Sequence, residues 1–84
     1  MKKLTSRQLE LQKLILEETR SSGFPPNYKR LLALTRNTSI ANICDRIIER
    51  GWLHQPYEGG PYIPTRDLDG TPLKLELVRG TQED

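Results

Sequence analysis

A run of short polar side chains precedes the most regularly patterned segment of this sequence and continues into its first turns. Hydroxyl, amide and guanidinium groups of this kind can hydrogen bond to the edges of nucleic-acid bases and to phosphate oxygens, and an asparagine can pair with adenine through two hydrogen bonds. With one small neighbour included, the run consists of Arg36, Asn37, Thr38, Ser39, Ala41, Asn42 and Arg46. These residues are the candidate nucleic-acid contacts.

Three of these side chains also have simpler interpretations. Thr38 and Ser39 can serve only to cap the helix that follows them, because a hydroxyl in that position accepts a hydrogen bond from the first turn. Arg46 can form a surface ion pair with Asp45 or Glu49. Asn42 can be a solvated surface residue, so the polar run alone leaves both interpretations open.

Two further groups could contact phosphate. Lys2, Lys3 and Arg7 stand at or near the start of the first predicted helix, where they either reach a nucleic-acid backbone or only make the chain soluble. Gly59 and Gly60 mark the tip of a predicted hairpin and could offer backbone amides. Residues 54–64 contain no Lys or Arg, so this hairpin would lack the positive charge that a phosphate-binding wing usually carries.

The sequence offers nothing for catalysis or for a bound cofactor. It has one histidine, His54, and one cysteine, Cys44, which excludes an internal disulfide and argues against a metal site. There is no serine–histidine–aspartate set and no glycine-rich phosphate loop after a strand. No apolar run is long enough for a membrane span or a signal peptide. We expect a cytoplasmic protein that is not an enzyme and that uses no cofactor, no metal and no small-molecule substrate.

Three helices are predicted to position the polar run. The first begins at Thr5, where Gln8 completes a capping box, and ends near Ser21. The second is capped by Asn27 and ends near residues 35–36, with Tyr28, Leu31, Leu32 and Leu34 on its buried face. The third spans residues 39–50 and has the strongest apolar periodicity in the chain, on Ile40, Ile43, Cys44, Ile47 and Ile48.

Strand and turn patterns follow Gly51. Residues 52–55 and 61–64 predict a hairpin, Asp69-Gly70 predicts a second turn, and Leu73, Leu75 and Leu77 alternate as in a half-buried strand. The predicted fold class is α+β: a winged helix-turn-helix with three helices followed by a small antiparallel β-hairpin or three-stranded sheet. Residues 1–66 form its DNA-binding domain, and residues 67–84 add a C-terminal strand and a frayed tail to the same domain.

Charge is distributed unevenly along the chain. Residues 1–50 contain ten Lys and Arg against five acids, whereas residues 51–84 contain three against six. A basic helical half suits a chain that presents this half to phosphate, although a solvated charge mixture gives the same count.

The opening Leu4-Thr5-Ser6-Arg7-Gln8 and the later Gly23-Phe24-Pro25-Pro26 resemble the DNA-binding domain of the LexA repressor family, and Glu49-Arg50-Gly51-Trp52-Leu53 resembles the end of that family's recognition helix. The resemblance covers residues 1–64 and implies a winged helix that reads double-stranded DNA. The family's two acidic reading residues are absent, because its reading stretch falls on residues 38–42. The resemblance therefore does not bring the family's operator, and it does not extend to the family's second domain, so it does not bring self-cleavage either.

These observations predict a sequence-specific double-stranded DNA-binding transcription regulator, a repressor by resemblance, that places helix 39–50 in the major groove. The alternative is a winged-helix protein-interaction module that docks on a regulatory or replication protein, favoured by the acidic second half and the uncharged wing. Residues 73–78 either complete the sheet by pairing with residues 62–66 or form a homodimer through their free edge.

Overall fold

Three helices and a short hairpin follow one another along the chain, in the predicted order. The computed structural model describes residues 3–73 of the 84 residues, and its elements are α1 (Ser6–Ser22), α2 (Tyr28–Thr35), α3 (Ile40–Glu49), β1 (Leu53–His54) and β2 (Ile63–Pro64). This is a small α+β structure with a two-stranded antiparallel sheet, and its layout is compatible with a winged helix. No helix in the described part of the chain has the length and apolar character needed to cross a membrane.

Both ends of α1 follow from local sequence. The Thr5 hydroxyl oxygen accepts a hydrogen bond from the Gln8 amide (3.2 Å), and the Gln8 side-chain oxygen accepts one from the Thr5 amide (3.1 Å), which confirms the capping box. Leu4, which precedes the cap, is buried in the core. The helix ends at Ser22 because Gly23 adopts a left-handed conformation with φ of 85°.

The start and end of α2 are also as predicted. The Asn27 side-chain oxygen accepts a hydrogen bond from the Arg30 amide (2.9 Å), and Arg36 stops the helix in a left-handed conformation with φ of 57°. The prediction that Leu34 lies on the buried face was wrong, since this residue is 42% exposed. The buried side is centred on Leu31, and Leu34, three residues further on, lies at the edge of that side, where packing leaves it exposed.

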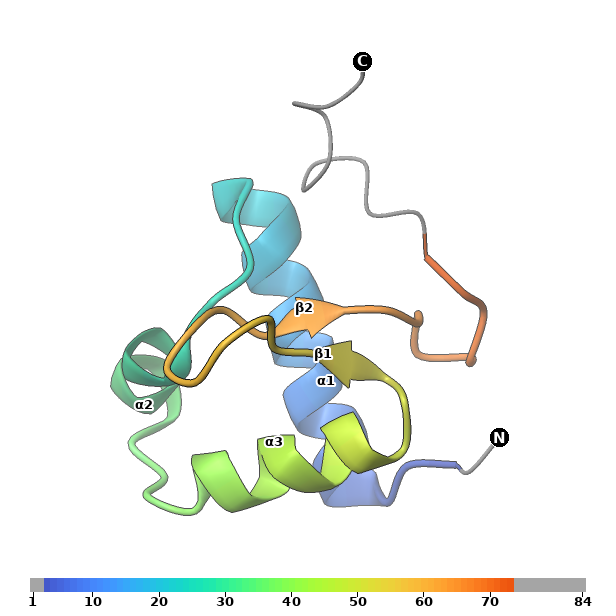
Figure 1. Ribbon diagram of the computed structural model, residues 1–84, viewed down its shortest axis with the longest axis horizontal. Helices are drawn as coiled ribbons and strands as arrows, with labels where there is room; N and C mark the ends of the chain where they lie inside the picture. Colours follow the sequence, from blue (N-terminus) through green and yellow to red (C-terminus); the bar gives the residue numbers. More distant parts are fainter. Residues whose placement is uncertain (1–2, 74–84) are drawn as a thin grey trace.

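The core lies where α1, α3 and the hairpin meet (Figure 1). The predicted apolar face of α3 is confirmed: Ile40, Cys44 and Ile47 are fully buried, and Ile43 and Ile48 pack partly buried against the same cluster. In Figure 1, α3 crosses the N-terminal half of α1, so the opposite side of α3 is left toward solvent.

The strands are shorter than predicted. Leu53 pairs with Pro64 and His54 with Ile63, and prolines at positions 56, 61 and 64 limit further pairing because they have no amide hydrogen to donate. The second turn forms at Asp67–Gly70, and the chain then returns beside the hairpin, with an isolated bridge between Arg66 and Pro72. Residues 74–78, on which the third strand and the homodimer depend, lie outside the described residues.

Candidate nucleic-acid interface

The turn between α2 and α3 is held by Asn37. Its amide donates to the Thr35 hydroxyl (3.2 Å), its side-chain oxygen accepts from the Ser39 amide (2.8 Å), and its carbonyl accepts from the Ile40 amide (3.2 Å). Sequence analysis identified Asn37 only as a candidate contact and missed this structural role. Because the side-chain oxygen is used inside the turn, only the amino group of this side chain is free to bind a ligand.

The first turn of α3 presents unpaired polar groups. Ser39 occupies the N-cap position, but its side chain makes no capping hydrogen bond, unlike Thr5 in α1 and Asn27 in α2. The amides of Ala41 and Asn42 donate to no acceptor within residues 3–73. Thr38, Ser39 and Asn42 are exposed, and Ala41 is half-buried. The turn is therefore held by Asn37, which leaves the hydroxyls of residues 38 and 39 available.

A shallow groove joins the start of α1 to the exposed side of α3. It has a volume of about 260 Å³, and its lining includes Arg7, Asn42 and Arg46, which we call the interface strip. Asn42 and Arg46 share one side of α3 because they are four residues apart. Neither arginine has an ion-pair partner within 4.0 Å in the described part of the chain, so the ion pair considered for Arg46 does not form there. The fold thus brings together three candidate residues from two distant segments.

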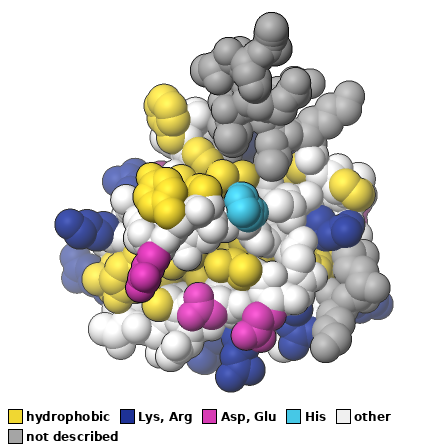
Figure 2. All heavy atoms as spheres, in the orientation of Figure 1, with side chains coloured by type: hydrophobic (Ala, Val, Ile, Leu, Met, Phe, Trp, Pro, Cys, Tyr) yellow, Lys and Arg dark blue, Asp and Glu magenta, His cyan; other side chains and the backbone are white. Residues whose placement is uncertain are grey.

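The solvent side of α3 also carries acidic side chains. Asp45 and Glu49 are exposed and also four residues apart, and each stands three positions after a residue of the interface strip, so they border that strip. Burial, followed by the charges of Cys44 and Asp45, raises the pKa of the Tyr62 hydroxyl to about 12. Figure 2 shows acidic side chains across this face and Lys and Arg side chains at its margins.

The hairpin loop (residues 55–62) is bound to the body of the protein. The Tyr62 amide donates to the Pro26 carbonyl (2.8 Å), and the loop tip closes through a hydrogen bond from the Gly60 amide to the Tyr57 carbonyl (2.9 Å). Gly60 is buried, and a side chain there would collide with the Tyr57 ring. The Gly60 amide is therefore not available to phosphate, whereas Gly59 is exposed.

The remaining candidates are spread more widely. Lys3 is exposed, and its carbonyl accepts a hydrogen bond from Arg50 (3.1 Å), which fixes the start of the chain beside the end of α3. Arg36 is exposed at the end of α2. Lys2 lies outside the described residues. Within residues 3–73 there is no group of three His, Cys, Asp or Glu side chains that could hold a metal ion.

Comparison with known proteins identifies no relative. No protein-family model matches the chain, and no curated protein or solved structure is significantly similar to it.

Proposed function

We propose that this protein binds double-stranded DNA with α3, as a small winged helix-turn-helix transcription regulator. The observation that carries the proposal is the interface strip, in which Arg7 of α1 and Asn42 and Arg46 of α3 line one open groove. Two guanidinium groups that have no ion pair within residues 3–73, beside an exposed amide, combine phosphate contacts with a group that can read a base edge.

The polar first turn of α3 gives the expected orientation on DNA. A major groove about 12 Å wide admits one helix, whose N-terminal residues contact base edges. In this arrangement Ser39 and Asn42 face the bases, while Arg7 and Arg46 approach the phosphates. Asp45 and Glu49 border the interface strip, so we expect the duplex to lie toward the α1 side of α3, where its phosphates are farther from these carboxylates.

The LexA-like residues support the repressor interpretation in part. Thr5 and Gln8 form the capping box, Leu4 is buried beside it, and Gly23 terminates α1, so these matches reflect the architecture of the first helix. Arg7 has no such task in the first helix, and it lies on the interface strip. We therefore carry over DNA binding and the helix-turn-helix from the resemblance, but not the operator.

Binding to duplexes selected from a random pool tests this function. The affinity should fall linearly with salt on logarithmic axes, with a slope near 0.9 for each phosphate neutralised. Asn42→Ala should cost about 1 to 3 kcal/mol on the selected duplex and much less on an unrelated one, because it removes a base contact. Lys13→Ala, an exposed change elsewhere on α1, is the control for general effects. Equal loss on both duplexes would contradict base reading by α3.

The alternative of a protein-docking module has one observation in its favour. Tyr57 at the tip of the hairpin loop is 65% exposed, next to the acidic Glu58, and tyrosine is among the residues enriched at the binding centres of protein interfaces. Partner binding through this aromatic residue would change little with salt and would be lost in Tyr57→Ala. DNA binding should be unaffected by the same substitution.

A further inference from the structure

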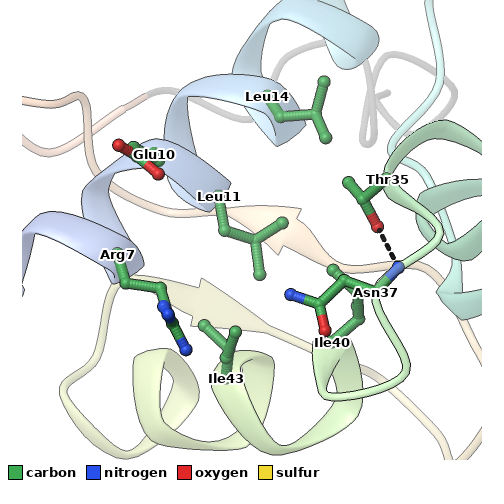
Figure 3. Close-up of a pocket in the computed structure, with 8 residues that line it drawn as sticks. All are labelled: Arg7, Glu10, Leu11, Leu14, Thr35, Asn37, Ile40 and Ile43. Atoms are coloured by element: carbon green, nitrogen blue, oxygen red, sulfur yellow. Dashed lines mark hydrogen bonds between the residues drawn. The ribbon is translucent and has the colours of Figure 1, made fainter.

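A second hollow lies beside the interface strip, between α1 and the turn before α3 (Figure 3). It has a volume of about 340 Å³, with an aliphatic floor and a polar rim on which Arg7 and Asn37 stand on opposite sides. Two residues of the floor, Leu11 and Ile40, are almost fully covered by the core. The other two, Leu14 and Ile43, are half-buried, so the hollow combines some apolar surface with a polar rim that can bind a small charged group.

The side chain of Asn37 has a defined orientation at this rim. Its oxygen accepts the hydrogen bond from the Ser39 amide at 2.8 Å, and this contact decides which end of the amide is the nitrogen. The amino group makes no hydrogen bond within residues 3–73, and Figure 3 shows it directed toward the hollow. Asn37 thus offers a fixed donor and no acceptor to whatever occupies the hollow.

Arg7 supplies the second donor. Its guanidinium group has no ion pair within the described residues and points toward the same hollow, whereas the Glu10 carboxylate points away from it (Figure 3). The Thr35 hydroxyl is already used, since it donates to the Leu31 carbonyl (2.8 Å) and accepts from the Asn37 amide. The free groups over the floor are therefore a guanidinium and an amide NH₂, both of which bind anionic oxygens.

We propose that this hollow binds one backbone phosphate of the duplex, with Arg7 and Asn37 donating to its non-bridging oxygens. The inference rests on the proposed DNA binding and adds to it the position of the backbone. Arg7 lines both the hollow and the groove of the interface strip, so a phosphate held here lies next to Asn42 and Arg46. One DNA strand would then run along the α1 side of α3, opposite the hairpin loop.

Two substitutions test the phosphate site without disrupting the turn. Asn37→Asp keeps an oxygen for the Ser39 amide and replaces the donor by a carboxylate, and Arg7→Gln removes the guanidinium from an exposed helix position. Each should weaken binding about tenfold on both selected and unrelated duplexes, and Arg7→Gln should reduce the salt slope by about 0.9. Lys13→Gln is the charge-matched control and should change affinity less than twofold. If both variants behave like this control while melting normally, the site is not where the phosphate binds.

An NMR titration with inorganic phosphate separates failure of this site from failure of the proposed function. In the wild type, the Asn37 side-chain amide and the Arg7 Nε–H signals should shift saturably, and Arg7→Gln should abolish the Asn37 shift. Duplex binding that is insensitive to both substitutions overturns the phosphate site and leaves the function standing. If the protein binds no duplex, the function fails, and a phosphate titration without saturable shifts overturns the site as well.

Discussion

The side-chain amino group of Gln12 donates a hydrogen bond of 3.1 Å to the backbone carbonyl of Trp52, 40 residues further along the chain. The same nitrogen donates to the carbonyl of Arg66 at 3.0 Å. Gln12 is fully buried in the middle of α1, where an apolar residue is the usual choice. This one amide fastens the first helix to both the hairpin and the segment that follows it.

Gln12→Ala should therefore destabilise the protein strongly. The substitution leaves a cavity and removes the side-chain donor to the Arg66 carbonyl, while the Trp52 carbonyl keeps the Thr65 amide as a donor (3.0 Å), so we expect a loss of about 2 to 4 kcal/mol in the free energy of unfolding. In a chain of this size such a loss approaches the total stability. Chemical denaturation measures the change, with the neighbouring exposed Lys13→Ala as control. A loss of stability no larger than that of the control would show that Gln12 does not hold α1 to the hairpin and to the segment that follows it.

The stability should also fall in alkaline solution. Burial raises the pKa of the Cys44 thiol from its ordinary value of 9.0 to about 12. Between these values the unfolded chain loses the proton while the folded protein keeps it, so this contribution to stability is complete below pH 9 and disappears as the pH approaches 12. Tyr62, with its pKa raised to about 12, acts in the same direction at slightly higher pH.

Melting temperatures measured between pH 7 and 10.5 test the role of the thiol. The wild type should lose stability above pH 9 more steeply than Cys44→Ala, even though that variant is less stable at neutral pH because of its cavity. At pH 8 the native thiol should react with iodoacetamide only through unfolding. Reaction at the rate of an exposed cysteine would contradict the burial of Cys44.

The hairpin loop should contribute little to DNA affinity. Glu58→Lys changes the charge of the loop by two units, yet at physiological salt, where screening acts over about 8 Å, we expect less than a twofold change in binding. The same change in Glu10→Lys, at the rim of the phosphate site, should strengthen binding and steepen the salt dependence. If Glu58→Lys strengthens binding as much as Glu10→Lys does, the loop lies on the duplex.

The helices could be predicted because their signals are local. The capping box at Thr5 and Gln8, the cap at Asn27 and the apolar face of α3 each depend on residues within a few positions of one another. Two features that depend on distant partners were missed. From sequence alone Gln12 is expected to be a polar surface residue, because the Trp52 and Arg66 carbonyls that it binds are distant in the chain. Leu34 is expected in the core, because only the packing of the other helices decides which side of α2 is covered.

The candidate site was predictable residue by residue but not as an arrangement. The chemistry of Arg7, Asn42 and Arg46 identifies them individually, whereas their meeting in one groove depends on how α3 packs across α1. The hydrogen bonds of Asn37 and Gly60 could not be read from composition either, because a turn decides which of their polar groups are used internally.

Backbone amide chemical-shift changes during titration with a selected duplex test the central claim most directly. The account predicts large changes for Arg7 and for residues 37–46, saturating together at one stoichiometry, with small changes across the hairpin loop, residues 55–62. Large changes confined to the hairpin loop, with α3 and Arg7 unaffected, would contradict DNA recognition by this surface.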